Sequence, residues 1–395
     1  MKLAHLADLH LGFRQYARQT PQGINQREAD VATAFRRAMD DVIAWEPDIM
    51  VVAGDIFHSV RPTNPAILDA FNQFRRFRQA VPSAPLVLVA GNHDTPRSVE
   101  TGSILTLFEA IQDVYVILHQ PRTIHFPNLD LSITGFPRTW VVASNRTSVQ
   151  PDSRARFNVK VVHGEVAGVV PGDRTFAQNA GSVIEPQELQ ADRWDYVGLG
   201  HYHTACRVLD NAWYAGAVEY VTNNPWGESH EGVRPVPKGA KGWLAVRIEE
   251  GGLGVEFRPI ALARRHIDLH PVFCQGLTAS AIDEMIAARV AEVEGGIDDQ
   301  VVRQVLYDVP RTVARDLNHV AIREYKARAL HYRFDARRPE RPEQVGIATG
   351  RRQTVAELVE SYLRECSLSP GVDREALVAL GREYLNLVER NLAEA

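Results

Sequence analysis

Histidine, aspartate and asparagine residues stand at the ends of several apolar segments of this chain. They occur in the motifs Asp-Leu-His, Gly-Asp-Ile-Phe-His, Gly-Asn-His-Asp, Val-His-Gly and Gly-His-Tyr-His, and the candidate metal ligands within them are Asp8, His10, Asp55, Asn92, His163, His201 and His203. Imidazole, carboxylate and amide groups together suit manganese, iron or zinc better than calcium or magnesium. Two such ions, about 3.5–4 Å apart, can hold a phosphate between them and activate a water molecule. The motifs therefore predict a two-metal centre for phosphoester hydrolysis.

These side chains can meet only if the segments before them form neighbouring strands. Residues 2–7, 48–53 and 86–90 have the apolar composition of buried strands, and the apolar spacing of residues 24–45 and 65–78 is typical of amphipathic helices. The alternation of strands and helices predicts an α/β fold with a parallel sheet. In such sheets ligands gather at the carboxyl ends of the strands, which is where the motifs begin.

The middle of the chain is richer in strands and predicts a second sheet packed on the first. The strands expected there cover residues 129–134, 159–163, 196–200, 212–215, 242–248 and 255–259. We therefore expect a layered α/β domain, with two packed sheets flanked by helices, over residues 1–263.

The remainder of the chain predicts a small α+β capping module and a helical tail. In the module, residues 264–335, we expect a helix at 279–294 between strands at 266–269 and 304–308, with residues 315–317 and 325–332 completing it. Arginine and proline mark residues 336–350 as a linker. Residues 351–395 form the helical segment, in which Thr-Val-Ala-Glu matches a capping box and a second helix follows a Pro-Gly turn.

Two further histidines lie beside the candidate ligands. His93 follows the asparagine ligand, and a protonated imidazole there would stabilise charge in the transition state or protonate the leaving oxygen. His58 lies three residues after Asp55 and is a candidate for positioning the substrate or His93. Asp94 has two equally weighted interpretations, because it would either orient His93 or cap the N-terminus of a helix.

Composition limits the other classes of function. The net charge is -5 at pH 7, so contact with nucleic acid must come from local basic patches or from bound metal. Three widely spaced cysteines fit a reducing compartment better than a disulfide framework. Cys206, close to His203, is either a thiolate ligand or, as the usual burial of free cysteine favours, a small apolar residue. No secretory signal or membrane span is visible, which predicts a cytoplasmic protein.

The series of motifs resembles the calcineurin-like metallophosphoesterase superfamily. The histidine that ends Gly-Asp-Ile-Phe-His, the opening Leu-Ala-Asp-Leu-His-Leu-Gly and residues 214–220 are similar to its DNA repair nuclease branch, the SbcD type. Protein serine/threonine phosphatases instead carry an Asp-Arg-Gly continuation and usually Gly-Asn-His-Glu, and neither occurs here. The resemblance implies manganese-dependent 3′-to-5′ exonuclease and endonuclease action on DNA.

The resemblance also implies roles for individual residues and segments. One metal ion would take Asp8, His10, Asp55 and His203, and the other would take the shared Asp55 with Asn92, His163 and His201. His93 matches the catalytic histidine of the family. The module at 264–335 would shape DNA access, and the C-terminal helices would bind a coiled-coil ATPase of the SbcC type, unless they fold back on their own domain or on a second copy. A homodimer through the helices after the first two motifs is also implied.

Two other functions stay open alongside the DNA nuclease. The same fold would also suit an enzyme for a small phosphodiester or phosphomonoester, although such an enzyme needs neither the extra module nor the helical tail. A metal-poor scaffold for protein binding would be expected to have broken ligand motifs, and none is broken here. The arginines that flank the motifs are candidates for phosphate contacts in DNA: Arg14, Arg61, Arg97 and Arg138.

Overall fold

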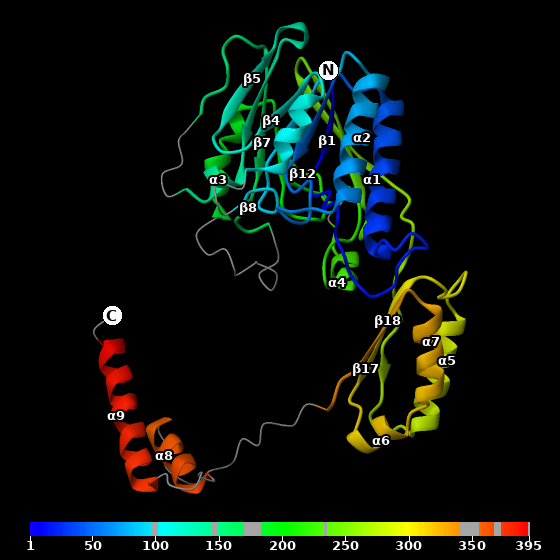
Figure 1. Ribbon diagram of the computed structural model, residues 1–395, viewed down its shortest axis with the longest axis vertical. Helices are drawn as coiled ribbons and strands as arrows, with labels where there is room; N and C mark the ends of the chain where they lie inside the picture. The colour runs from blue at the N-terminus through cyan, green and yellow to red at the C-terminus, as the bar shows by residue number, and fades with distance from the viewer. Residues whose placement is uncertain are drawn as a thin grey trace. The chain divides into compact units, whose positions relative to one another are not determined.

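Two packed sheets form the body of the N-terminal part of the protein (Figure 1). The computed structural model describes residues 1–96, 102–143, 149–169, 183–232, 235–339, 355–366 and 373–393. The chain separates into two units, Met1–Arg337 and Arg338–Ala395. The first unit contains both sheets and the module that follows them.

The first sheet carries the strands that precede the N-terminal motifs. Its order is β14-β13-β1-β2-β3-β4. The strands are β1 (Lys2–Leu6), β2 (Ile49–Ala53), β3 (Leu86–Val89), β4 (Val114–Ile117), β13 (Gly242–Glu249) and β14 (Gly252–Pro259). Strands β1 to β4 run parallel, whereas β13 is antiparallel to β1 and β14 is antiparallel to β13. The carboxyl ends of β1, β2 and β3 therefore meet at one edge of the sheet.

The second sheet contributes the C-terminal motifs. Its order is β11-β12-β10-β7-β6-β5. The strands are β5 (Arg122–Phe126), β6 (Leu131–Phe136), β7 (Phe157–His163), β10 (Tyr196–Gly200), β11 (Cys206–Leu209) and β12 (Ala212–Tyr214), and a separate short pair consists of β8 (Glu165–Val166) and β9 (Val183–Ile184). Strands β6, β7, β10 and β12 are parallel. The carboxyl ends of β7 and β10 therefore carry these motifs.

Helices cover the outer face of the first sheet. The long ones are α1 (Gln26–Trp45) and α2 (Asn64–Ala80) (Figure 1). Asn25 begins α1 by accepting hydrogen bonds from two backbone N–H groups of the first turn, and Thr63 caps α2. The shorter helices are α3 (Arg138–Val141) and α4 (Pro225–Ser229), and the 3₁₀ segments are η2 (Ile104–Ala110), η3 (Pro127–Leu129), η5 (Pro186–Leu189) and η6 (Ala191–Arg193).

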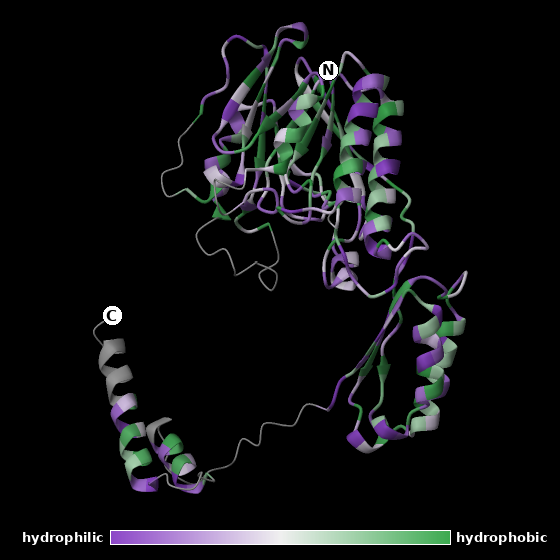
Figure 2. Cartoon of the chain, viewed as in Figure 1, coloured by the Kyte–Doolittle hydropathy of each residue, from purple (hydrophilic) through white to green (hydrophobic). Residues whose placement is uncertain are grey.

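The side chains of the first sheet alternate between two cores. Leu6 and Val52 belong to the core shared with α1 and α2, whereas Leu3 and Val51 belong to the core between the two sheets. Figure 2 shows the resulting pattern, with apolar strands inside and helices of mixed hydropathy outside. Each fully buried aliphatic side chain contributes about 1.5–3 kcal/mol to folding. The predicted fold of two packed sheets flanked by helices is confirmed, but the strands expected at 242–248 and 255–259 belong to the first sheet and not to the second, because β13 pairs with β1 and β14 pairs with β13.

A small α/β module, called the cap module below (residues 264–337), follows β14, the last strand of the first sheet in chain order. Its elements are β15 (His266–Asp268), β16 (Val272–Phe273), α5 (Ala279–Ala291), β17 (Val301–Tyr307), α6 (Arg311–Asp316), α7 (His319–Arg328) and β18 (His331–Ala336). Strand β17 is the centre of its sheet and pairs in parallel with the other strands. The residue pattern does not predict α7, because Ile322 is the only buried residue of this helix and its apolar spacing is weak.

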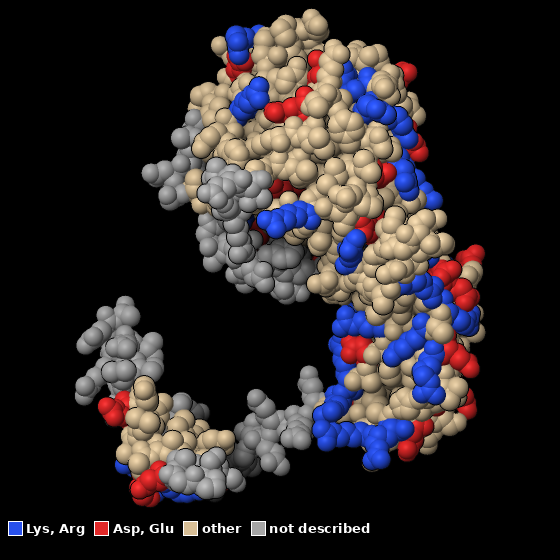
Figure 3. All heavy atoms as spheres, in the orientation of Figure 1, with Lys and Arg blue, Asp and Glu red and all other residues tan. Residues whose placement is uncertain are grey.

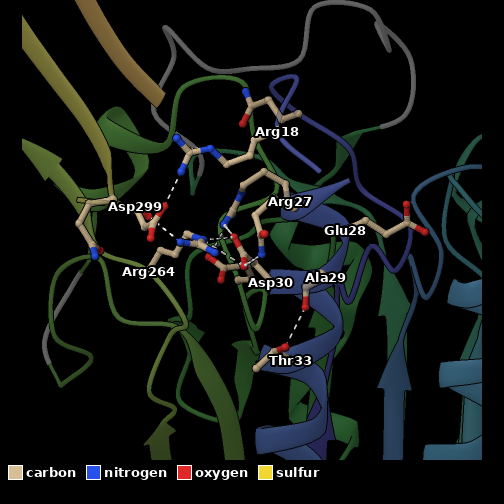
Figure 4. Close-up of polar contacts among 12 residues, drawn as sticks. Arg18, Arg27, Glu28, Ala29, Asp30, Thr33, Arg264 and Asp299 are labelled. Carbon is tan, nitrogen blue, oxygen red and sulfur yellow. Dashed lines mark hydrogen bonds and ion pairs between the residues drawn. The ribbon is translucent and has the colours of Figure 1, made fainter. Parts of the chain in front are cut away.

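Ion pairs connect the cap module to the N-terminal end of α1. Arg264 donates to the Asp30 carboxylate at 3.0 Å, and Asp30 also pairs with the buried Arg27 (Figure 4). Arg18 pairs with Asp299 and donates to main-chain carbonyls of the module. These contacts hold the module against the loop that follows the first motif.

The second unit contains a pair of packed helices, α8 (Val355–Glu365) and α9 (Arg374–Ala393). Leu358, Tyr362, Leu380 and Tyr384 are exposed on them. Among the described helices, none is both long enough and apolar enough to cross a membrane.

Candidate metal centre

The candidate ligands converge where the two sheets bring their strand ends together. Asp8 and His10 follow β1, Asp55 follows β2, His163 ends β7 and His201 follows β10. Four of these five residues, all except His163, adopt positive φ, with values of 50°, 43°, 50° and 107° in chain order. A left-handed conformation costs a non-glycine residue of order 1–3 kcal/mol and is common at functional sites. The surrounding structure therefore holds these side chains in a strained arrangement that converges on one point.

One group of donors contains Asp8, His10 and His203, whose ligand atoms all lie within 4.8 Å of one another. The Nε2 atoms of His10 and His203 are 3.2 Å apart, and Nε2 of His10 is 3.6 Å from Oδ2 of Asp55. Nitrogen lone pairs brought this close need a proton or a cation between them. This geometry fits a cation.

A second group contains Asp55, His163 and His201, again within 4.8 Å. Oδ1 of Asn92 lies 3.0 Å from Nε2 of His163 and 3.0 Å from Nδ1 of His201. Oδ2 of Asp55 is 3.4 Å from Nε2 of His163. Because Asp55 approaches histidines of both groups, its carboxylate stands where a bridge between two ions would be needed.

The contacts behind the ligands orient them toward this point. Nδ1 of His163 donates to the main-chain oxygen of Ala53 at 2.8 Å, which leaves its Nε2 lone pair facing the centre. The backbone N–H of His201 donates to the Asp8 carboxylate at 2.9 Å. A Cβ atom on Gly54 would lie 2.1 Å from Nδ1 of His163, so no other residue fits there without displacing this ligand. The donor types and their orientation fit a pair of divalent cations.

Burial and mutual charge set the proton affinities of these ligands. Burial raises the pKa of Asp8 to about 7, and burial lowers the pKa of His201 and of His203 to about 3. Burial alone would lower the pKa of His163, but the neighbouring Asp55 carboxylate raises it to about 9. His163 in turn keeps the pKa of Asp55 well below its usual range despite burial. The neutral imidazoles of His201 and His203 are in the protonation state that binds a cation, and bound cations would compensate the buried carboxylates.

His93 and His58 lie at the rim of the centre. Nδ1 of His93 contacts the main-chain oxygen of His58 at 2.6 Å, and the backbone N–H of His93 donates to Asp55 at 2.8 Å. This leaves Nε2 of the half-buried His93 ring for a substrate oxygen. The His58 ring instead contacts His10, with 3.2 Å between their Nδ1 atoms. His58 therefore supports both His93 and His10.

Asp94 makes contacts that neither interpretation from the sequence includes. Its carboxylate accepts hydrogen bonds from the backbone N–H groups of Ile56, Phe57 and Gly91, at 3.0–3.1 Å. It therefore joins the turn after β2 to the turn after β3, whereas residues 97–101, where a capped helix would begin, lie outside the described residues. The prediction missed this because the three donors come from two separate motifs.

The remaining residues singled out from the sequence differ in how far they are buried. Arg14 is exposed and pairs with Glu28, and Arg61 is exposed next to the Asp55 loop. Arg138 is buried at the start of α3, and Arg97 lies outside the described residues. Cys206 is buried, and burial raises the pKa of its thiol to about 12, which favours the apolar interpretation over a thiolate ligand.

Sequence reasoning missed the polar residues that support the Gly-His-Tyr-His turn. The ammonium group of Lys241 donates to the main-chain oxygen of His203 at 2.9 Å and pairs with Glu228. Glu231 accepts from the hydroxyls of Tyr202 and Thr204 at 2.7 and 2.9 Å. These residues lie in a long irregular segment, where the only signal is a set of charged residues without helical or strand spacing.

Comparison with known families identifies this arrangement of ligands. Residues 1–205 match the calcineurin-like phosphoesterase family. The chain belongs to this family. The resemblance stated from the motifs is thereby confirmed, and the match spans the strands and turns that carry all the candidate ligands.

Relatives of this phosphoesterase include DNA repair proteins. It is 26% identical over 220 residues to the DNA double-strand break repair protein Mre11 of Methanopyrus kandleri, covering 52% of this chain and 45% of that protein. It is 24% identical over 363 residues to the protein of the same name from Methanosarcina mazei, covering 82% and 55%. The chain thus spans about half the length of these relatives. A solved structure, the nuclease MPE of Pseudomonas putida, is 18% identical with a TM-score of 0.21, covering 42% of this chain and 63% of that one.

Proposed function

We propose that this phosphoesterase is a DNA nuclease that uses two manganese ions, with 3′-to-5′ exonuclease and endonuclease activity in the processing of DNA ends. The observation that carries the proposal is the convergence of histidine, carboxylate and amide donors in two adjoining groups that share Asp55. The relatives named as DNA double-strand break repair proteins support DNA as the substrate. The mixed donor set favours manganese over magnesium.

The residues divide the chemistry between holding ions and moving charge. Asp8, His10 and His203 would hold one ion, and His163, His201 and Asn92 would hold the other, with Asp55 between them. When bound, such a pair would polarise a phosphodiester and activate the attacking water. His93, fixed through Nδ1 by the His58 carbonyl, would present Nε2 to a phosphate oxygen or to the leaving oxygen.

Positive charge outside the metal centre would assist the approach of DNA. Figure 3 shows Lys and Arg side chains gathered over the cap module, while its Asp and Glu side chains lie mainly toward α5 and α7. Arg61 is exposed near the Asp55 loop and is the best placed of the predicted phosphate contacts. Arg14 is held by Glu28 and Arg138 is buried, so both are weaker candidates.

The C-terminal helices are proposed to bind a coiled-coil ATPase of the SbcC type. Leu358 and Tyr362 are spaced by one helical turn on α8 and are 54% and 70% exposed, and Leu380 and Tyr384 repeat this spacing on α9. Exposed apolar residues spaced in this way are typical of a helix that packs against another helix. A homodimer through α1 and α2 is also proposed, since Leu68 on α2 is 62% exposed.

End-labelled duplex DNA tests the catalytic proposal. The protein is incubated with manganese, with magnesium alone and as a His93→Ala variant. Manganese-dependent shortening that falls by about 10²–10⁴-fold in the variant is expected, because that is the usual contribution of a general acid. The labelled end that is lost gives the polarity.

Intact DNA in the presence of bound manganese would contradict the DNA substrate. Turnover of a chromogenic phosphodiester under the same conditions would then assign the site to a small phosphoester. Absence of bound manganese on metal analysis would contradict the metal centre itself.

A further inference from the structure

The short helix α4 connects the cap module to the segment that carries two of the candidate ligands. It lies at the junction of the cap module and the two-sheet body, where it contacts β15 (Figure 1). Its side chains reach in both directions: Trp226 toward the cap module and Glu228 toward the segment 201–204. Neither the metal centre nor the proposed mechanism accounts for this arrangement.

On the cap side, α4 is held by packing and by charge. Trp226 is 1% exposed and forms an apolar cluster with Val301 and Leu330 of the module. The guanidinium groups of Arg303 and Arg333 lie 5.3 and 5.6 Å from the centre of its indole ring. Cation–π contacts of this kind stabilise the position of a buried ring.

The residue that follows α4 adds a second contact on the same side. Nε2 of His230 lies 3.1 Å from the Asp268 carboxylate on β15. Residues at both ends of α4 therefore contact the cap module.

On the metal side, α4 holds a buried lysine. Glu228 pairs with the ammonium group of Lys241, and both side chains are almost completely buried. The ammonium group also lies 4.7 Å from the centre of the Tyr220 ring. It donates to the main-chain oxygen of His203 at 2.9 Å, and the backbone N–H of Ala217 donates to the same oxygen at 3.0 Å.

A second carboxylate just beyond α4 fixes the same segment. Glu231 accepts from the hydroxyls of Tyr202 and Thr204, the two residues on either side of His203. The main-chain oxygen of His203 is thus held by Lys241 and Ala217, and the side chains on either side of His203 are held by Glu231. A ligand whose main chain is fixed loses less conformational freedom when it binds a cation.

We propose that Lys241 and Glu228 are positioning residues for His203. Through the contacts of Trp226, α4 also makes the affinity of the metal centre for manganese depend on the position of the cap module. The inference rests on the proposed function, because it takes His203 as a metal ligand. Removing groups that orient metal ligands typically weakens metal binding by 10- to 100-fold.

The test measures manganese binding rather than DNA cleavage. Free Mn²⁺ is titrated by its EPR signal against the full-length protein and its variants at a temperature where all are folded. Lys241→Met is expected to raise the Kd for manganese by tenfold or more, and Lys241→Arg, which keeps a cationic donor, is expected to restore most of the affinity. The Trp226 indole contacts the cap module and not the candidate ligands, yet Trp226→Leu is expected to raise the Kd for manganese by roughly 2- to 30-fold.

A matched control comes from the opposite end of the first sheet. Lys2 makes the same two kinds of contact, donating to the main-chain oxygen of Trp45 at 2.7 Å and lying 5.2 Å from the centre of its ring. Lys2→Met is therefore expected to lower stability without changing the Kd for manganese.

The double variant Trp226→Leu/Lys241→Met separates a shared path from independent damage. Its Kd should be no higher than that of Lys241→Met alone, because both changes act on the same contact. If Lys241→Met does not fold, Glu228→Gln, which keeps the side-chain volume, is expected to raise the Kd in its place.

The outcomes are distinguishable from those of the nuclease assay. An unchanged Kd in Lys241→Met, or in Glu228→Gln, would refute the positioning role. An unchanged Kd in Trp226→Leu, or full additivity in the double variant, would refute the dependence on the cap module. If the wild-type protein binds manganese but leaves DNA intact, the proposed function fails while the Kd values still decide this inference.

Discussion

Removing the Asp94 carboxylate is expected to weaken both folding and metal binding. The carboxylate is 1% exposed and accepts three backbone hydrogen bonds, from Ile56, Phe57 and Gly91. A buried N–H group left without a partner costs about 1–3 kcal/mol. Asp94→Ala, which leaves three such groups unpaired, should therefore lower the free energy of unfolding by roughly 3–9 kcal/mol, a large part of the stability of an ordinary domain.

The conservative variant Asp94→Asn makes the metal effect measurable in a folded protein. Two of the three N–H groups, those of Ile56 and Gly91, donate to the same oxygen, Oδ2. An amide oxygen in that place keeps both bonds, while the amide nitrogen faces the N–H of Phe57. The expected loss of stability is about 1–3 kcal/mol. The Kd for manganese should rise about 10- to 100-fold, because the turn that carries Asp55 is no longer tied to the turn that follows β3.

Urea unfolding of the metal-free protein measures the first effect, and manganese titration measures the second. Asp48→Ala is the matched control, because its carboxylate also accepts from a backbone N–H, that of Lys2 at 2.6 Å, at the end of the sheet away from the metal centre. It should lose stability and keep its affinity for manganese. A stable Asp94→Asn variant with unchanged manganese affinity would show that the turn holds its shape without this carboxylate.

Three further predictions concern packing, pH and DNA. Gly200→Ala should destabilise the protein and lower its melting temperature, because the new Cβ would lie 1.8 Å from the main-chain oxygen of Ala53. Burial lowers the pKa of His5 to about 3, so only the unfolded chain binds this proton below pH 6.5, and stability falls as pH decreases. In urea unfolding between pH 7 and 5.5, His5→Phe should lose about 1 kcal/mol less than the wild type. Arg61→Ala should weaken DNA binding and reduce its salt-dependence slope by about 1, whereas an unchanged slope would remove this contact.

Much of the fold follows from local patterns in the sequence. The strands β2 and β3 are continuous apolar segments because they are buried on both faces, and β1, which lies between the same two cores, departs from this pattern only at Lys2 and His5. The helices α1 and α2 have regular apolar spacing because only one face of each packs on the sheet. Helix α7 lacks such a face, and this is the physical reason that the sequence did not predict it.

The order of residues alone indicates which chemical groups stand at the strand ends, because each motif is a short stretch in which a strand stops and a polar residue follows. How those groups face one another depends on the packing of the folded chain. The orientation of His163 depends on the Ala53 carbonyl, Asp94 joins two turns, and Lys241, which precedes β13, donates to the main-chain oxygen of His203. Such contacts join residues that are far apart in the chain. They therefore depend on how the two sheets, α4 and the cap module pack together, and no local spacing in the sequence predicts them.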